Sequence, residues 1–292
     1  MDSKPYTPVL GYFNLRFRGL LKSLIIGCLK HMRPFEQPAS SPGRTAFFWS
    51  ISSLIILAWL VLWIWGRSPY GRYLEHGQLG AIAHGAGGSI LLSATLYIAG
   101  WTLMTIAMML PTTLPLLEIF RRLTRQRRDH LQLIVLVILG YLAVWVCFGV
   151  AAHLADWFIH QLVERNSWLE QNVWVIGAGT LLLAGGFQFS RLKYRCLDKC
   201  RAPLSFVLEH WRGRHDYRNA LLLGTHHGIF CVGCCWALML LMFGVGVGNL
   251  GWMLGLGVLM ATEKNLPWGH KLSAPLGIVL LGCGATLAFT HF

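Results

Sequence analysis

The sequence predicts an all-α protein that forms a polytopic membrane helical bundle of about seven transmembrane helices. Of its 292 residues, 55% are hydrophobic and only 13% are charged, and the mean hydropathy is +0.52. Soluble domains carry roughly 25% charged residues, so this composition is typical of a membrane protein. The apolar segments lack the alternation of barrel strands, and helices satisfy their own backbone hydrogen bonds in lipid.

Seven apolar segments account for the predicted spans. They are Phe47–Trp65, Gly88–Leu110, Leu131–Ala155, Val173–Phe189, Gly228–Val245, Leu250–Thr262 and Ala274–Thr290. The sixth is short, and Pro111 and Pro115 are expected to end the second, because proline interrupts a helix. The segments define a transmembrane domain, 47–292.

A basic tail, residues 1–46, precedes the first predicted span. Within it, residues 15–30 carry apolar side chains at helical spacing, flanked by Arg and Lys. This pattern suits a helix that lies on the inner leaflet and is attracted to anionic lipid. A disordered basic tail is the alternative.

Lysine and arginine orient the predicted bundle. Alternate connecting segments hold 22 of the 25 basic residues, and the remaining segments hold 3. The positive-inside rule therefore predicts a cytoplasmic N-terminus and, with seven spans, an external C-terminus. Such loops explain the net charge of +13 without a nucleic-acid partner. Spans two to four and five to seven are candidate halves of a 1+3+3 inverted repeat.

Five of the eight cysteines lie within 40 residues, near the predicted cytoplasmic surface. Cys196 and Cys200 are four residues apart, whereas Cys231, Cys234 and Cys235 lie at the start of the fifth predicted span. On helices the members of each group share a face, so both groups together can supply zinc's four thiolates or the fewer that Cu(I) needs. A reducing cytoplasm disfavours stable disulfides. The pattern favours a metal site, with thiol redox chemistry or packing as alternatives.

Other candidate ligands lie close to the cysteines. His227 precedes the second cysteine group, and Met104 and Met108 lie one helical turn apart near the same predicted surface. Thioethers suit Cu(I) and not zinc, although methionine also fills gaps between packed helices. Glu263 and Lys264, at the end of the sixth segment, are expected either to orient a ligand or to form an interfacial ion pair.

A second, weaker cluster is predicted near the outer surface. His153, Asp156 and His160 are spaced by three and four residues, so they share one helical face. Histidine and carboxylate can bind Zn²⁺ or Cu²⁺, or form hydrogen bonds at the lipid headgroups. Hydrogen bonding is the simpler interpretation.

Several classes of activity are disfavoured. The central parts of the predicted spans contain no Asp, Glu, Lys or Arg, whereas proton-coupled carriers usually keep one there. The sequence has no Walker phosphate loop and no HExxH motif, and no Ser/His/Asp constellation is recognisable. A non-enzymatic role is therefore favoured.

Four stretches together carry a family resemblance. "WTLMTIAMMLPTTLPLL", "AGGFQFSRLKYRCLDKCRAPLSF", "HHGIFCVGCCWALMLLMFGVGVGNLGWM" and "EKNLPWG" resemble the bacterial predicted metal-binding integral membrane proteins, a domain family of unknown function. The resemblance covers roughly Trp101 to Gly269. It implies a multi-pass protein of the bacterial inner membrane and a metal bound by the cysteines.

The resulting hypothesis is an integral membrane protein that binds a soft metal ion, Cu(I) or zinc, and handles or delivers it. Its partner would be a metal-donating or metal-receiving protein. The leading ligands are Cys196, Cys200, Cys231 and Cys234, with Cys235 or His227 able to substitute. Two alternatives stay open: a membrane thiol–disulfide oxidoreductase that uses Cys231 and Cys234, and an assembly subunit with a structural metal.

Overall fold

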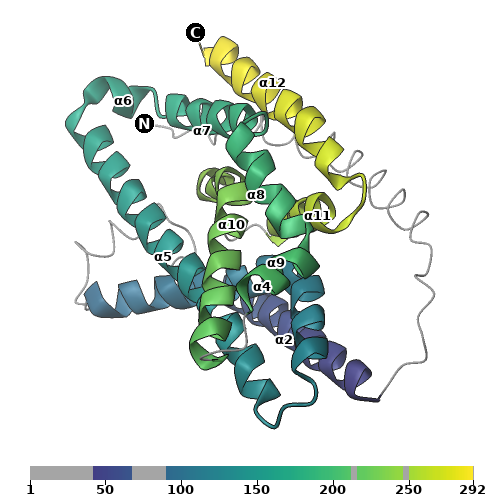
Figure 1. Ribbon diagram of the computed structural model, residues 1–292. Coiled ribbons are helices and arrows are strands. Elements are labelled where there is room, and N and C mark those ends of the chain that lie inside the picture. The colour runs from purple at the N-terminus through teal and green to yellow at the C-terminus, as the bar shows by residue number, and fades with distance from the viewer. Residues whose placement is uncertain (1–41, 68–89, 212–215, 246–249, 292) are drawn as a thin grey trace. The chain divides into compact units, whose positions relative to one another are not determined.

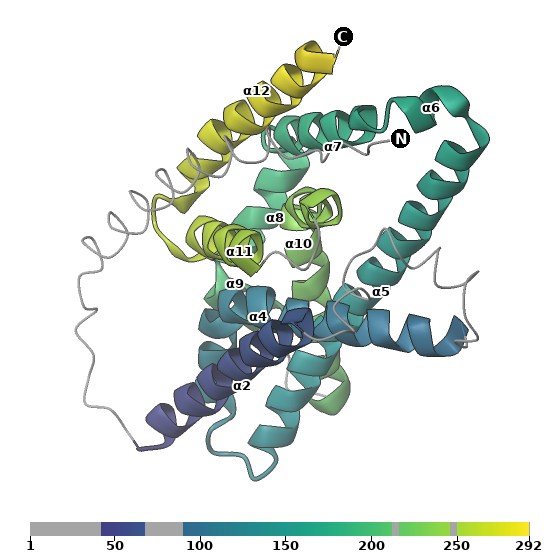
Figure 2. The same ribbon diagram turned by 180° about the vertical axis from the view of Figure 1, so that it is seen from behind.

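The computed structural model describes residues 42–67, 90–211, 216–245 and 250–291, and over these residues it is helical (Figures 1 and 2). The all-α prediction is confirmed for this part of the chain. The chain divides into two units, Met1–Ser52 and Ser53–Phe292, and the second contains the whole candidate site. The predicted helix at 15–30 lies outside the described residues, so the division at residue 46 stays a prediction.

The described residues contain helices and no strands. In chain order they are α2 (Pro42–Arg67), α4 (Ile90–Thr124), α5 (His130–Arg165), α6 (Ser167–Gln171), α7 (Trp174–Phe187), α8 (Arg191–Arg201), α9 (Pro203–His210), α10 (Asp216–Val245), α11 (Leu250–Asn265), the 3-10 turn η3 (Gly269–Leu272) and α12 (Ser273–His291). Each predicted apolar segment overlaps one of these helices, although the bounds differ.

Five helical stretches in the described parts are long and apolar enough to cross a membrane. They are Thr45–Arg67, Thr95–Thr124, His130–Arg165, Asp216–Met242 and Gly269–His291. Helices α7 and α8 make a sixth if the pair, bent by 62°, forms one broken span. The short predicted segment coincides with α11, which has 16 residues. Multiple spans are therefore supported, while the count of seven, the orientation and the 1+3+3 repeat stay predictions.

Helix α5 shows how such a span meets lipid. Leu131, Val135 and Leu139 recur every four residues on one face and are 63%, 52% and 51% exposed. Large apolar side chains exposed in a continuous helical row are costly in water and favourable in hydrocarbon. This face is therefore suited to contact lipid.

Helix α4 continues through both prolines, so the prediction that they end the second span is wrong. It extends from Ile90 to Thr124 with Pro111 and Pro115 inside. Proline at position 111 cannot donate to the carbonyl of Ala107, and the indole Nε1 of Trp59 donates to that carbonyl at 3.2 Å instead. A neighbouring helix that satisfies the freed carbonyl allows proline inside a membrane helix.

Helix α10 begins earlier than predicted. It starts at Asp216, whereas the predicted span starts at Gly228, so three additional turns replace part of the expected loop. Cys231 consequently lies near the middle of a 30-residue helix and not at its start. The first four residues of α10, DYRN, are polar, so hydropathy alone did not predict this extension.

Helices α5 and α10 approach each other through glycine. A Cβ atom on Gly224 would overlap the backbone carbonyl of Val137, and one on Gly140 would overlap that of Leu221. Small residues at these crossings let helix backbones pack at the short distances typical of membrane bundles. Helices α5 and α10 lie side by side here (Figure 1). This contact places Tyr141, the next residue on α5, 3.0 Å from the Cys231 thiol near the middle of α10.

The α5–α10 contact predicts a strong effect of one methyl group. Gly224→Ala should lower the stability of the purified protein by about 1–3 kcal/mol or more, because backbone atoms cannot move aside as a side chain can. Thermal unfolding in detergent measures this. The matched control is Gly179→Ala in α7, where nothing lies within 4 Å of the new methyl. Equal unfolding temperatures for the two variants would contradict the proposed contact.

Candidate metal site

The thiols of the two cysteine groups lie together, as the sequence predicts. The thiol of Cys234 lies close to those of Cys200, Cys231 and Cys235. Cys200 comes from α8, and the other three come from α10. The thiols of Cys234 and Cys235 also donate to the carbonyl of Cys231, at 3.1 and 2.8 Å. Four of the predicted cysteine ligands therefore form one cluster, which we call the thiol cluster.

Cys196 lies at the edge of the thiol cluster. It shares a face of α8 with Cys200, and its Sγ atom is 2.6 Å from the position that a Cβ atom would take on Gly233. Only glycine at position 233 leaves room for the Cys196 thiol here. The absence of a side chain on α10 thus allows α8, with both of its cysteines, to approach.

A lysine lies against the thiol cluster. The Nζ atom of Lys264, on α11, is 2.9 Å from Sγ of Cys231 and 3.8 Å from Sγ of Cys235, and it is 3.4 Å from Oγ1 of Thr112 on α4. Lys264 is only 5% exposed. The hydroxyl of Tyr141 lies 3.0 Å from the Cys231 thiol on another side. An ammonium group in this position stabilises negative charge on the sulfur atoms.

Glu263 has a different partner, so it does not form the expected ion pair with Lys264. Its carboxylate accepts from Nζ of Lys193, on α8, at 2.9 and 3.0 Å, and from Oγ of Ser273 at 2.8 Å. Lys193 also donates to Gln188. Lys193 and Glu263 are 0% and 2% exposed, so the pair is fully buried. It fastens α8, the helix that carries Cys196 and Cys200, to α11.

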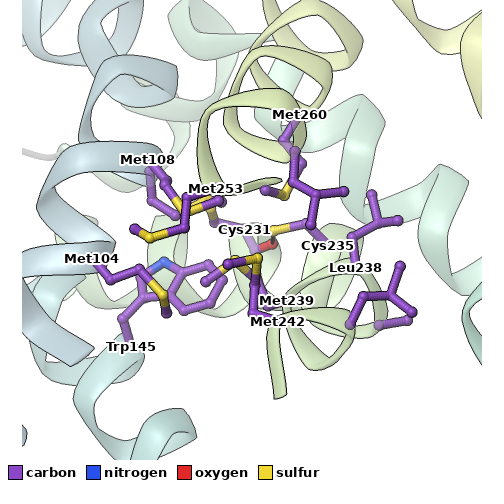
Figure 3. Close-up of a cluster of buried hydrophobic side chains, with 14 of the residues drawn as sticks. Met104, Met108, Trp145, Cys231, Cys235, Leu238, Met239, Met242, Met253 and Met260 are labelled. Carbon is purple, nitrogen blue, oxygen red and sulfur yellow. Dashed lines mark hydrogen bonds between the residues drawn. The ribbon is translucent and has the colours of Figure 1, made fainter. Parts of the chain in front are cut away.

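Buried methionines surround the thiol cluster (Figure 3). Met104 and Met108, which the sequence singles out, are 0% and 2% exposed and belong to the same core as Cys231 and Cys235. Sequence reasoning missed five further members of this core: Met109, Met239, Met242, Met253 and Met260. The four-residue spacing from Cys235 to Met239 continues the cysteine face along α10 and could have identified Met239 from the sequence.

The predicted histidine ligands lie outside the thiol contacts. His227 is buried one turn before Cys231, with its ring 5.8 Å from that of Tyr141 and its Nδ1 atom without a hydrogen-bond partner. On α5, Nδ1 of His160 lies 3.0 Å from the backbone carbonyl oxygen of Asp156 and 3.7 Å from its carboxylate, and the His153 ring stacks on Tyr97. Hydrogen bonding and stacking are thus the contacts observed in this second cluster.

In the described parts of the chain, no three or more His, Cys, Asp or Glu side chains are arranged so that they could hold a metal ion together. The thiols of Cys234 and Cys235 instead donate to the Cys231 carbonyl. Their chemistry nevertheless suits a soft ion, since thiolates bind both Cu(I) and zinc and thioethers favour Cu(I).

The buried Lys193–Glu263 pair predicts a large loss on substitution. Lys193→Met leaves the Glu263 carboxylate buried without a cation and should destabilise the protein by about 3–5 kcal/mol. Thermal unfolding in detergent measures this loss. Lys199→Met is the matched control on the same helix, because its pair with Glu209 is exposed, at 46% and 55% of the side chains. That control should change stability little. If Lys193→Met destabilised the protein as little as Lys199→Met does, the position of α8 would not depend on the buried pair.

The family model described as PpoB2, copper chaperone, matches residues 98–287 of the 292-residue chain. The match includes α5 to α11, the four cysteines of the thiol cluster, Cys196 and Lys264. No curated protein and no solved structure matches.

Proposed function

We propose that this protein, which belongs to the PpoB2 copper chaperone family, binds Cu(I) in the thiol cluster and delivers it to a copper-receiving protein. Membership in this family implies copper as the cargo and an acceptor protein as the partner. The observation that supports the site most directly is the contact of the Cys234 thiol with thiols from both α8 and α10. The long apolar helices support a multi-pass membrane location.

The donor set favours Cu(I) over zinc. Structural zinc requires four ligands in a tetrahedron, whereas Cu(I) is held by about two or three sulfur atoms. The described residues contain no finished group of three or more ligands, and the polarisable methionines around the thiols suit copper. We therefore infer that two or three thiols of the cluster turn toward the ion when it binds.

Charge balance supports the same choice. Two thiolates around one Cu(I) ion carry one net negative charge, and a buried charge is costly unless it is paired. The Lys264 ammonium, 2.9 Å from the Cys231 thiol, supplies the balancing charge. Four thiolates around Zn²⁺, like three around Cu(I), would leave one negative charge unbalanced beside the same lysine, so the charges favour Cu(I) held by two thiolates.

Delivery requires a ligand that an acceptor can reach. Cys231, Cys234 and Cys235 are at most 2% exposed, whereas Cys200, on α8, is only partly buried. An acceptor thiolate that approaches past Cys200 could form its bond to Cu(I) as the bond to Cys200 breaks. The oxidation state of copper does not change in this exchange. The basic segments near α8 and α9 support a cytoplasmic position for this step, at the bacterial inner membrane.

Copper content tests the proposal. Cys234→Ser should remove most of the bound copper from protein purified under reducing conditions, because Cys234 contacts the other three thiols. Cys147→Ser, at an exposed cysteine of α5, should retain it. Cys200→Ser and Cys231→Ser should each lower occupancy, and the double variant should be little worse, since ligands of one site are not additive. Elemental analysis gives the copper-to-protein ratio.

Alkylation of the cysteines distinguishes metal binding from redox chemistry. Bound thiolates should resist alkylation until a Cu(I) chelator removes the ion. Additive losses in the two single variants would indicate separate sites on α8 and α10. Unchanged copper in every cysteine variant, or a substantial Cys231–Cys234 disulfide trapped from growing cells, would overturn the proposal. The disulfide would favour the oxidoreductase alternative.

Lys264 predicts an electrostatic effect on affinity. Lys264→Met should weaken Cu(I) binding at least tenfold, or about 1.4 kcal/mol, because the buried thiolates lose their counter-charge. Lys264→Arg should keep most of the affinity, and Lys271→Met, at an exposed lysine of η3, should keep all of it. Competition with a calibrated Cu(I) chelator measures the three values. An unchanged affinity in Lys264→Met would show that the ion binds away from this lysine.

A further inference from the structure

Seven of the nine methionines of the chain belong to the buried core that contains the thiol cluster. Met1 and Met32, the other two, lie outside the described residues. The seven come from α4, α10 and α11, and each is at most 2% exposed. Packing alone does not require this concentration, because leucine fills a helical core equally well.

One contact brings these three helices together. The Lys264 ammonium, on α11, contacts Thr112 on α4 and Cys231 on α10. The separation of each methionine from this contact can be counted along its own helix, starting at Thr112 on α4, Cys231 on α10 or Lys264 on α11. At 1.5 Å per residue, Met108 and Met260 are about 6 Å along the helix axis from Thr112 and Lys264, respectively. Met104 and Met239 are about 12 Å along the axis from Thr112 and Cys231.

The methionines of the three helices belong to one buried core, and α11 packs closely on Met108 of α4. Gly257, midway between Met253 and Met260 on α11, would place a Cβ atom 3.6 Å from the side chain of Met108 on α4. Figure 3 shows Met104, Met108 and Met253 gathered beside Cys231, with Met239 and Met242 close by on α10. Met104 and Met108 are four residues apart and share a face of α4, so their thioethers can approach one ion.

We propose that the thioethers of Met104, Met108 and Met253 form a second Cu(I) site beside the thiol cluster. This inference rests on the proposed function, since it takes Cu(I) as the cargo. Thioethers are neutral, so they hold Cu(I) more weakly than thiolates, and the ion passes from the thioether site to the thiol cluster. Each transfer exchanges one Cu–S bond for another without change of oxidation state. The thioether site thus supplies copper to the thiols from within the bundle.

Silver(I), which has the preferences of Cu(I) and no redox chemistry under these conditions, is the probe. The full chain in lipid nanodiscs should bind two Ag(I) ions, and the variant Met104→Leu/Met108→Leu/Met253→Leu should bind one. The variant Cys196→Ser/Cys200→Ser/Cys231→Ser/Cys234→Ser/Cys235→Ser, called thiol-free because it lacks the five thiols at this site, should also bind one. Adding the three Leu substitutions should weaken that binding at least tenfold. Met109→Leu is the control, since residue 109 is equally buried on α4 but turned about 100° from Met108.

Leucine nearly conserves the volume of methionine, so these variants should fold, and their unfolding temperatures check it. Two Ag(I) ions in the triple Leu variant, or equal losses from it and from Met109→Leu, would overturn the thioether site and leave the thiol cluster intact. The thioether site would also be overturned if the thiol-free variant bound no Ag(I) ion that depends on the three methionines. If the thiol-free chain kept both ions, the thiol proposal would fail and the thioether site would stand.

Discussion

The contact between the Lys264 ammonium and the Cys231 thiol is the interaction on which the candidate site depends. It joins α11 to α10 and, through Thr112, to α4, at a point where only 5% of Lys264 is exposed. A buried cation requires partners that carry or develop negative charge, and sulfur atoms are the partners available here. The same contact therefore holds the three helices together and places a positive charge beside the thiols of the proposed site.

Two further constraints bring the remaining groups to this point. The glycine contact between α5 and α10 brings Tyr141 within 3.0 Å of the Cys231 thiol. The buried Lys193–Glu263 pair fastens α8 to α11, and Gly233 leaves room for the Cys196 thiol. The buried pair and Gly233 control whether the cysteines of α8 can reach those of α10. Loss of either should therefore affect copper binding through the position of a helix.

Copper explains features that zinc would leave unexplained. Membership in a copper chaperone family implies the ion, and the surrounding core is rich in thioethers, which zinc does not prefer. A single balancing lysine beside buried thiols suits a monovalent ion held by few thiolates. A carrier must also release its cargo, and an incomplete set of thiols, one of them partly exposed on α8, suits release better than a closed tetrahedral site does.

The sequence by itself determined the helical class, the positions of the apolar segments and the grouping of cysteines on helix faces, because these follow from composition and from a local period of 3.6 residues. Tertiary structure decided which faces meet. Glu263 and Lys264 are adjacent in sequence, yet successive residues point about 100° apart on a helix, and their partners lie on different helices. The passage of α4 through its prolines likewise depends on Trp59, a donor 48 residues from the carbonyl that it satisfies.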